Sequence, residues 1–406
     1  MTSTPAVRFE RLTGLLAEWY PVWSVEPFQC LQPPWAPFRP QRTGGLRFDA
    51  AALAGWLPVE QLTELIDLPR MPAVAGPPPE RLGHRVGGRK WRQIVAFASR
   101  VRITPGQSIV EWCAGKGHLA RTLAHSQCTP VTGLESDAQL CREGQALAER
   151  QGVALHLQQQ DVLAPDVLQW LHPNTHVVAL HACGDLHLRL LDLAAQTGCA
   201  ISLAPCCYQR TMQERYQPLS ETGRELAGRH ALMLTRQDLA LAVQETVTAP
   251  LHAQRQRRRA KAWRLGFDLL QRELRGVDEY LPVPRLRYGD LPTDYQGFCR
   301  WAAAEKQLAL PCSIDWKAWE RAGWTRLEEV ERLEQVRHLF RRPLEVWLAL
   351  DRARRLEEAG MRVDLGSFCD REVTPRNLLL RASRASPTLP VRLDMLGSGW
   401  SVVDPV

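Results

Sequence analysis

Between residues 108 and 207 the sequence alternates short apolar runs with helical runs, and this rhythm limits the fold more than any other feature. The apolar runs read SIVEWCA, PVTGLE, ALHLQQQD, HVVALHAC and CAISLAPCC, and each of the first four precedes a helical stretch. Strands separated by helices pair in parallel, because a parallel neighbour is reached only through a crossover connection. We therefore predict an α/β fold with a Rossmann-like, doubly wound parallel sheet.

The rhythm changes on both sides of this region. The predicted segments are a Pro- and Trp-rich N-terminal arm (1–87), the first half of the sheet (88–207), a mainly helical insertion (208–360) and closing strands with a tail (361–406). One helix is expected over residues 48–68 and an amphipathic helix over residues 88–101. Two late strands, MRVDLGSFCD and RNLLLRAS, close the sheet, and the tail after Ser386 is expected to be irregular.

The composition is that of a globular protein, with 45% hydrophobic and 23% charged residues. No window approaches the ~18 consecutive apolar residues of a membrane-spanning helix. The first residues, MTSTPAVRFERLTG, lack a basic-then-apolar signal pattern, so we expect a cytoplasmic protein with no membrane association. The 11 cysteines include no CxxC pair, so neither a disulfide framework nor a zinc finger is indicated, and no metal is expected.

A glycine-rich loop follows the first strand in the stretch VEWCAGKGHLA, residues 110–120. It does not fit a phosphate-binding Walker A loop, because Lys116 lies between the glycines and no Ser or Thr follows. A dinucleotide-binding GxGxxG loop fits with Ala120 in the third position, but that pattern alone is weak evidence. The loop also has the (D/E)xxxGxG form that holds S-adenosylmethionine in Rossmann-like methyltransferases. A plain tight turn is the remaining alternative.

Acidic residues end the first three strands, which favours the S-adenosylmethionine interpretation. Glu111 ends the first strand, and Glu135 ends the second about twenty residues after the loop, where a carboxylate can accept hydrogen bonds from ribose hydroxyls. Asp161 follows the third strand, where it would meet the adenine edge. Glycines in the loop let the backbone approach a ligand closely. The predicted cofactor-binding residues are Glu111, Ala114, Gly115, Gly117, His118, Glu135, Ser136, Asp161, Val162 and His181.

Thiol and titratable side chains gather where the fourth and fifth strands end, in HACGDL and APCCYQR. Ligand chemistry in open α/β sheets lies beyond the carboxyl ends of the strands, so these side chains would meet the methyl acceptor. The predicted catalytic residues are His181, Cys183, Asp185, Cys206 and Cys207.

Four blocks, VEWCAGKGHLA, LHACGDL, APCCYQ and REVTPRNLLL, together resemble one family of S-adenosylmethionine-dependent methyltransferase domains over roughly residues 88–385. The family includes the eukaryotic tRNA 2′-O-ribose methyltransferase of the acceptor stem and uncharacterised relatives. The tRNA enzyme carries small zinc-binding modules ahead of its catalytic domain, whereas Cys30 is the only cysteine before residue 100 here. The resemblance implies that Glu111, Gly115, Gly117, Glu135 and Asp161 hold the cofactor, that His181, Asp185, Cys206 and Cys207 line the acceptor side, and that Lys90 matches a basic position before the first strand.

Two kinds of methyl transfer are open to these residues. Oxygen methylation needs a hydroxyl held in line with the sulfonium and a proton acceptor, for which Asp185, His181 and Lys116 are candidates. Methylation of cytosine C5 needs an attacking thiolate, and Cys183 and Cys206 fit the positions that RNA enzymes of that type use. The cysteines are also explained as small buried hydrophobes. A zinc site has no support from spacing, although it could form in three dimensions from His181, Cys183, Cys206 and Cys207.

A strongly basic run, HAQRQRRRAKAWRLGFDLLQRELR, occupies residues 252–275 in a chain of net charge +7. Such a helix can contact phosphates and position an RNA without reading its sequence, and a solvated helix face is the alternative. The predicted substrate-binding residues are Lys90, Lys116, Tyr208, Arg210, Arg255, Arg258 and Arg259. We expect methylation of structured RNA, a tRNA or rRNA, with ribose 2′-O favoured over cytosine C5. The alternatives are a protein or small-molecule methyltransferase and a non-catalytic RNA-binding module.

Overall fold

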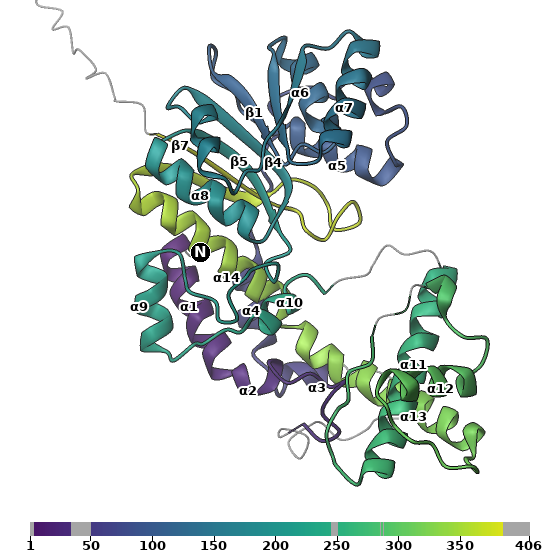
Figure 1. Cartoon of the computed structure of the whole chain (residues 1–406). Helices are drawn as coiled ribbons and strands as arrows, with labels where there is room; N and C mark the ends of the chain where they lie inside the picture. Colours follow the sequence, from purple (N-terminus) through teal and green to yellow (C-terminus); the bar gives the residue numbers. More distant parts are fainter. Residues whose placement is uncertain (1–3, 34–49, 245–250, 285, 287, 385–406) are drawn as a thin grey trace, which may run out of the picture.

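A seven-stranded sheet forms the centre of the part of the molecule drawn at the top of Figure 1. The computed structural model describes residues 4–33, 50–244, 251–284, 286 and 288–384. The strand order is β3-β2-β1-β4-β5-β7-β6, in which β1 to β5 are parallel and β7 is antiparallel to β5 and β6. The strands are β1 (Ser108–Trp112), β2 (Val131–Glu135), β3 (Leu155–Gln159), β4 (Thr175–Cys183), β5 (Ala200–Cys206), β6 (Met361–Ser367) and β7 (Leu378–Arg384). This order confirms the predicted Rossmann-like sheet with its two closing strands.

Two layers of helices cover the sheet, because neighbouring residues of a strand point to opposite faces. In β1, Ile109 packs in the apolar layer of α5, α6 and α7, whereas Val110 packs in the layer of α8 and α14. Figure 1 shows these helices around the strands. Their bounds are α5 (Gly88–Ala98), α6 (His118–Gln127), α7 (Ala138–Gln151), α8 (Asp185–Thr197) and α14 (Arg341–Glu358), with the short 3₁₀ turns η2 (Glu80–Gly83) and η3 (Pro165–Trp170).

The winding direction reverses at β1, which pairs with β2 on one side and with β4 on the other. The chain adds β2 and β3 on one side of β1 before it returns to add β4 and β5 on the other. A crevice opens at the carboxyl ends of the strands at such a reversal, and ligands of open α/β sheets bind there.

The N-terminal helices pack around the first half of α14 in one core with helices of the predicted insertion. Trp23 and Trp347 are fully buried in this core, and their indole nitrogens donate hydrogen bonds to the Leu16 carbonyl (2.9 Å) and the Thr13 hydroxyl (2.8 Å). The arm and the insertion therefore share one apolar interior. The helices are α1 (Pro5–Glu18), α2 (Tyr20–Trp23), α3 (Ala50–Ala54), α4 (Val59–Ile66), α9 (Glu221–Arg229) and α10 (Arg236–Leu241).

The helix predicted over residues 48–68 is wrong as a single element, because two short helices, α3 and α4, occupy this region. Pro58 stands directly before α4 as its N-cap. Proline has no backbone N–H, so a continuous helix would lose a hydrogen bond at this position. The predicted tail after Ser386 lies outside the described residues.

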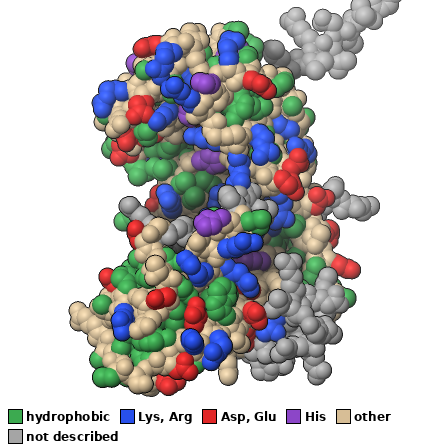
Figure 2. Space-filling view, turned by 90° about the vertical axis from the view of Figure 1, so that its right-hand side faces the viewer, with side chains coloured by type: hydrophobic (Ala, Val, Ile, Leu, Met, Phe, Trp, Pro, Cys, Tyr) green, Lys and Arg blue, Asp and Glu red, His purple; other side chains and the backbone are tan. Residues whose placement is uncertain are grey.

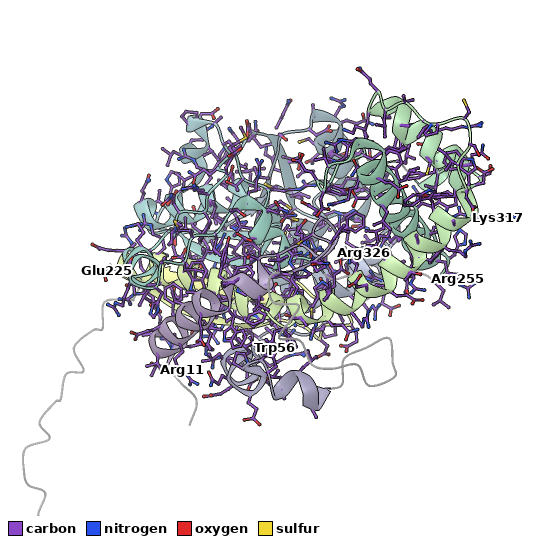
Figure 3. All side chains as sticks on the ribbon, turned by 90° about the horizontal axis from the view of Figure 1, so that it is seen from below. Arg11, Trp56, Glu225, Arg255, Lys317 and Arg326 are labelled. Atoms are coloured by element: carbon purple, nitrogen blue, oxygen red, sulfur yellow. The ribbon has the colours of Figure 1, made fainter. Side chains whose placement is uncertain are left out.

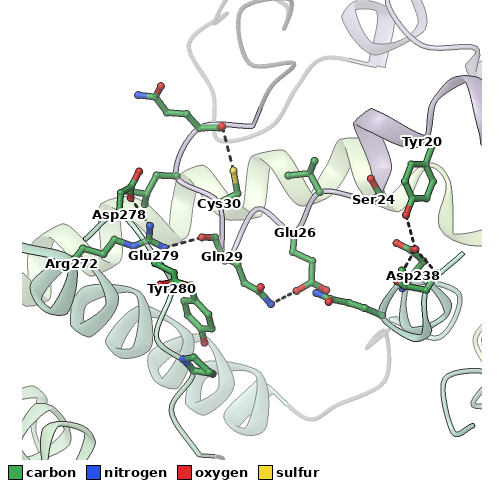
Figure 4. Close-up of a pocket in the computed structure, with 16 residues that line it drawn as sticks. Tyr20, Ser24, Glu26, Gln29, Cys30, Asp238, Arg272, Asp278, Glu279 and Tyr280 are labelled. Atoms are coloured by element: carbon green, nitrogen blue, oxygen red, sulfur yellow. Dashed lines mark hydrogen bonds and ion pairs between the residues drawn. The ribbon is translucent and has the colours of Figure 1, made fainter. Parts of the chain in front are cut away.

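Residues 251–338 form a helical lobe that stands apart from the sheet at the lower right of Figure 1. It consists of α11 (Leu251–Arg275), the turn η4 (Tyr288–Asp290), α12 (Tyr295–Glu305) and α13 (Trp316–His338). Buried arginines join it to residues 23–30: Arg326 donates to the Pro27 carbonyl (2.7 Å) and Arg337 to the Trp23 carbonyl (2.9 Å). A cavity of about 1010 Å³ lies here, and Figure 4 shows the residues that line it, with Arg272 donating to the Gln29 carbonyl (2.8 Å).

Among the helices that the structure describes, none is both long and apolar enough to cross a membrane.

A buried carboxylate in the middle of α14 holds the chain that follows the fifth strand. Asp351 is completely buried, and its two oxygens accept hydrogen bonds from the Leu219 N–H (2.8 Å), the Ser220 N–H (3.0 Å) and the Ser220 hydroxyl (2.6 Å). The Tyr216 hydroxyl donates to the same carboxylate. The segment from residue 216 to 220 is thus fixed to α14 by one side chain.

We expect Asp351→Ala to lower the free energy of unfolding by about 3 kcal/mol, because four buried donors lose their acceptor. Urea-induced unfolding followed by circular dichroism measures this change. The matched control is Asp192→Ala, which removes a half-exposed carboxylate whose ion pair with Arg355 is 3.9 Å long. An exposed pair contributes at most about 1 kcal/mol, so equal effects of the two substitutions would contradict the expectation.

Candidate functional site

Left-handed backbone recurs at the carboxyl edge of the sheet. Six residues there have positive φ angles: Cys113 (57°), Gly115 (57°), Gly117 (61°), His181 (75°), Gly184 (55°) and Cys207 (48°). A non-glycine residue in this conformation costs on the order of 1–3 kcal/mol and persists only where its surroundings enforce it. The edge that the sequence predicts as the site therefore holds three strained non-glycine residues, Cys113, His181 and Cys207.

Glu111 holds the glycine-rich loop in place from inside the protein. Its carboxylate is 5% exposed and accepts a hydrogen bond from the Ala120 N–H (2.8 Å) in the first turn of α6. The N-cap of α6 is Gly117, which has no side chain to accept such a bond, so Glu111 takes the place of a capping residue. Burial raises the pKa of Glu111 to about 8.

Glu135 joins the loop to the end of β2. One carboxylate oxygen accepts a hydrogen bond from the Gly115 N–H (2.8 Å), and the other accepts bonds from the Asp137 N–H (3.0 Å) and the Ser136 hydroxyl (3.3 Å). The carboxylate therefore lies between the loop and the turn into α7, where a ribose would be held.

The remaining residues predicted for the cofactor lie around this pair. The Gln160 N–H donates to the Glu135 carbonyl (2.9 Å), which brings the end of β3 and the exposed Asp161 beside the end of β2. Ala114 and Val162 are buried, and their side chains belong to the apolar layers on the two faces of the sheet. His118 contacts Arg121, and burial lowers the pKa of His118 to about 4.

The two glycines of the loop have different roles. A Cβ at Gly117 would lie 2.6 Å from the Leu155 side chain, so glycine is needed there for packing of the loop against β3. A Cβ at Gly115 would meet no atom within 4 Å, so the space beside Gly115 is open to a ligand. Lys116, between them, forms an ion pair with Glu143 of α7.

His181 is held in one tautomer by Gln93 of α5. The Gln93 amide nitrogen donates to the Val373 carbonyl (3.2 Å), so its oxygen accepts a hydrogen bond from His181 Nε2–H (2.8 Å). This leaves His181 Nδ1 as a hydrogen-bond acceptor. Burial, with the nearby charges of Lys90 and Arg376, lowers the pKa of His181 to about 4, so the ring is neutral at pH 7.

Three thiols meet at the ends of β4 and β5. The Sγ atoms of Cys183 and Cys206 are 3.6 Å apart, and those of Cys183, Cys206 and Cys207 all lie within 4.8 Å of one another. Hydrogen bonds donated by the Cys183 and Cys206 thiols lower the pKa of Cys207, and Arg376 and Arg210 act in the same direction. Donation of its proton to these neighbours, together with burial, raises the pKa of Cys206.

Asp185 and Gly184 fix the chain that follows β5. Asp185 accepts a hydrogen bond from the Met212 N–H (2.9 Å), and its own N–H donates to the Arg210 carbonyl (3.0 Å). A Cβ at Gly184 would lie 1.8 Å from the same carbonyl oxygen, so only glycine permits this close approach. Asp185 is therefore a positioning residue in this structure.

Tyr208 is predicted as a substrate-binding residue, but the structure buries it on the other side of the loop. It is 2% exposed and packs against His187 and Arg352, with the guanidinium 4.7 Å from the ring centre. Cys207, directly before it, stays with the other thiols, and the Arg210 N–H donates to the Cys207 carbonyl (2.8 Å). Tyr208 supports the loop from behind and does not reach a substrate.

The basic run lies on α11, which is part of the helical lobe, and not beside the glycine-rich loop or the thiols. Arg258 forms an ion pair with Glu331 of α13 (2.8 Å), and Arg259 stacks on Trp263, which is itself 3% exposed. Arg255 lies on the side of the lobe (Figure 3). Lys261 also pairs with Glu334 (3.6 Å) and Arg272 with Asp268 (2.9 Å), so several charges of the run are paired within the lobe.

Two residues at the site are missed by the sequence interpretation, Gln93 and Arg376. Gln93 lies on a helix that precedes the first strand, and no local pattern distinguishes it from other polar residues of that helix. Arg376 lies within the block REVTPRNLLL, between β6 and β7, so the resemblance pointed to the segment but not to the residue. Arg376 contributes positive charge at both His181 and Cys207.

Residues 89–214 match the model of a family described as a methyltransferase domain. The matched residues run from α5 to just after β5 and make up less than half of the chain. Such domains use S-adenosylmethionine, and the loop, Glu135 and the open space at Gly115 are compatible with it.

A curated relative is the glutathione S-transferase C-terminal domain-containing protein of Xenopus laevis. It is 29% identical over 147 residues, which cover 35% of this chain and 23% of that protein, so the chain spans less than a quarter of its length.

Solved structures of two methyltransferases are also similar. Geranyl diphosphate methyltransferase in complex with S-adenosylmethionine is 14% identical over 34% of this chain and 62% of that chain, with a TM-score of 0.24. Coclaurine N-methyltransferase is 13% identical over 49% and 62%, with a TM-score of 0.25. These scores are too low to carry an argument, so the fold assignment rests on the strand order.

The His181 ring is expected to stay neutral, with its proton on Nε2, down to about pH 4, because burial and two cations oppose its protonation. Nitrogen-15 NMR of ring-labelled protein measures the titration, and His181→Gln assigns the signal. A midpoint near the ordinary value of 6.5, or a proton found on Nδ1 at pH 7, would contradict this assignment.

Proposed function

We propose that this chain is an S-adenosylmethionine-dependent methyltransferase that acts on structured RNA, a tRNA or rRNA, at a ribose 2′ oxygen. The observation that carries the cofactor assignment is the hydrogen bond between Glu135 and the Gly115 N–H at the point where the sheet reverses. It holds a carboxylate where ribose hydroxyls bind in folds of this type. The cofactor supplies an electrophilic methyl group on a sulfonium.

An electropositive cavity beside the loop supports the choice of an anionic substrate. Its volume is about 600 Å³, and it is bounded by residues before α5, by the loop and by α7. The charged and titratable side chains around it are His84, Arg85, Lys90, Lys116, His118, Glu143 and Arg150. Figure 2 shows Lys, Arg and His side chains across the upper and middle parts of the face that carries α7. Such groups contact phosphates and position an RNA without reading its bases.

The state of the two candidate thiols favours oxygen methylation over cytosine C5 methylation. Attack on a cytosine ring needs an accessible thiolate, whereas Cys206 is 3% exposed and the pKa values of both Cys183 and Cys206 are raised. A ribose hydroxyl needs only to be oriented and to release its proton. The neutral His181 Nδ1 is an acceptor that can orient such a hydroxyl.

Gly115→Ala is expected to weaken S-adenosylmethionine binding by at least about tenfold, ~1.4 kcal/mol, because the added Cβ enters the open space of the loop. The matched control is Gly106→Ala, which also has a positive φ (86° against 57°) and no atom within 4 Å of its Cβ, but precedes β1 at the opposite edge of the sheet. Isothermal titration calorimetry measures the two affinities. Thermal melting measures the loss of stability that the strained backbone causes in both variants. Equal affinities for the two variants would contradict the cofactor assignment.

Incubation with methyl-labelled cofactor and RNA from cells that lack the protein tests the substrate. We expect label in 2′-O-methyl nucleosides, identified by mass spectrometry after complete digestion. Lys90→Ala, on the cavity, should reduce both the labelling and the salt-dependent binding of RNA, whereas Lys317→Ala, exposed on the helical lobe (Figure 3), should not.

Other outcomes of the labelling experiment identify the alternatives. Label in 5-methylcytidine would show that the acceptor is cytosine C5 and that a cysteine takes part in the reaction, in place of methylation at a ribose oxygen. Label confined to protein or to small molecules would overturn the RNA substrate while leaving methyl transfer in place. Cofactor binding without any transfer would point to a non-catalytic RNA-binding module.

A further inference from the structure

The geometry of neighbouring strands brings together three cysteines that are up to 24 residues apart in the sequence. Cys183 and Cys206 are paired in register at the ends of β4 and β5, after an irregularity in β4 between Leu180 and Cys183. Cys207 follows directly in a left-handed conformation, with φ at 48°, which turns the chain back toward the other two thiols. Because the spacing depends on strand pairing, no sequence motif reveals it.

The distances between the sulfurs suit one tetrahedral ion. Zinc–thiolate bonds of about 2.3 Å place two sulfurs ~3.8 Å apart in a tetrahedral site. The Cys183 and Cys206 sulfurs are 3.6 Å apart, and no pair among the three exceeds 4.8 Å. Small side-chain rotations are therefore enough to place all three around a common centre.

We propose that Cys183, Cys206 and Cys207 bind one Zn²⁺ ion as three thiolates and leave its fourth coordination position open. Thiolate ligands favour soft and borderline ions such as zinc. His181 does not join this set: its Nε2 is bonded to Gln93, and neither ring nitrogen is among the atoms grouped with the three sulfurs. The site does not depend on the proposed RNA substrate.

The surroundings fit a metal better than they fit simple packing of hydrophobic cysteines. Cys206 is buried, but Cys183 and Cys207 are half-buried, so the sulfurs reach the edge of the sheet where ligands enter. Three thiolates with Zn²⁺ carry a net negative charge, and Arg210 and Arg376 act electrostatically on Cys207 from the following loop and from the segment before β7. In the part of the chain that the structure describes, this is the one group of three metal-binding side chains found.

An open coordination position would let such an ion bind a ligand in addition to stabilising the fold. Zinc with three protein ligands keeps the fourth site for water or substrate, and it lowers the pKa of the group bound there. The ion would lie on the acceptor side at the carboxyl ends of β4 and β5, where the Cys183 thiol donates to the His181 carbonyl (3.3 Å). A hydroxyl or thiol of the methyl acceptor could then bind as its anion.

The test uses the purified full-length protein, reduced, freed of metal and reloaded with Zn²⁺ or Co²⁺. We expect one zinc per chain by plasma mass spectrometry, and for Co²⁺ the absorption of a tetrahedral ion with thiolate charge transfer. In the wild-type protein, bound zinc should protect Cys183, Cys206 and Cys207 from alkylation, as measured by peptide mass spectrometry. This readout needs no substitution, so it does not depend on how a variant folds.

Variants then locate the ion. Cys183→Ser and Cys207→Ser should each lower zinc affinity at least about 100-fold, measured by competition with a chromophoric chelator. The controls are Cys128→Ser and Cys312→Ser, at exposed cysteines outside the group, which should bind zinc as the wild type does. The proposal would be overturned by an octahedral Co²⁺ spectrum or by equal zinc binding in all four variants. It would also be overturned if zinc did not protect the three thiols from alkylation, or if a Cys183–Cys206 disulfide formed in place of metal binding.

Discussion

The helix α14 is the element on which both halves of the molecule depend. Its first half is buried among the N-terminal helices, and its second half packs on the sheet beside α8. At their junction Asp351 fixes the chain after β5, and Arg352 donates to His187 (3.0 Å), whose other ring nitrogen lies 3.1 Å from the Ala182 carbonyl. The backbone beside Cys183 is thereby held by a helix far away in the sequence, since Arg352 and His187 are 165 residues apart.

The cofactor half of the site could be predicted from the sequence because it is local. Glu111, Gly115, Glu135 and Asp161 lie on three successive strand ends within one segment, and the order of parallel strands brings successive ends together. The strand–helix rhythm therefore predicted both the sheet and this edge. The pattern could not show that the two carboxylates have different roles: Glu111 accepts a hydrogen bond from the first turn of α6, and Glu135 accepts one from the loop.

The acceptor half could not be predicted in the same way, because it is assembled from distant segments. Gln93 and His181 are 88 residues apart, and their contact depends on how α5 packs on the sheet. The arginine run misled for a related reason. Its charges look unpaired in sequence, but Arg258 finds Glu331 on a helix 73 residues later. The sequence shows how many charges a run carries, but only the fold shows which of them are paired, because that depends on the helix packed beside the run.

The strain at the carboxyl edge links the two halves. Cys113, His181 and Cys207 adopt positive φ angles at the ends of β1, β4 and β5, at a cost on the order of 1–3 kcal/mol each. Hydrogen bonds hold the segments around these residues in place: Glu135 bonds to the loop, Gln93 to His181, and the Asp185 N–H to the Arg210 carbonyl on the chain after β5. A site built this way is formed before its ligands arrive, so binding energy need not be used to order it. Helix α14 adds to this support from further away, because Asp351 holds residues 219 and 220 and Arg352 reaches the Ala182 carbonyl through His187.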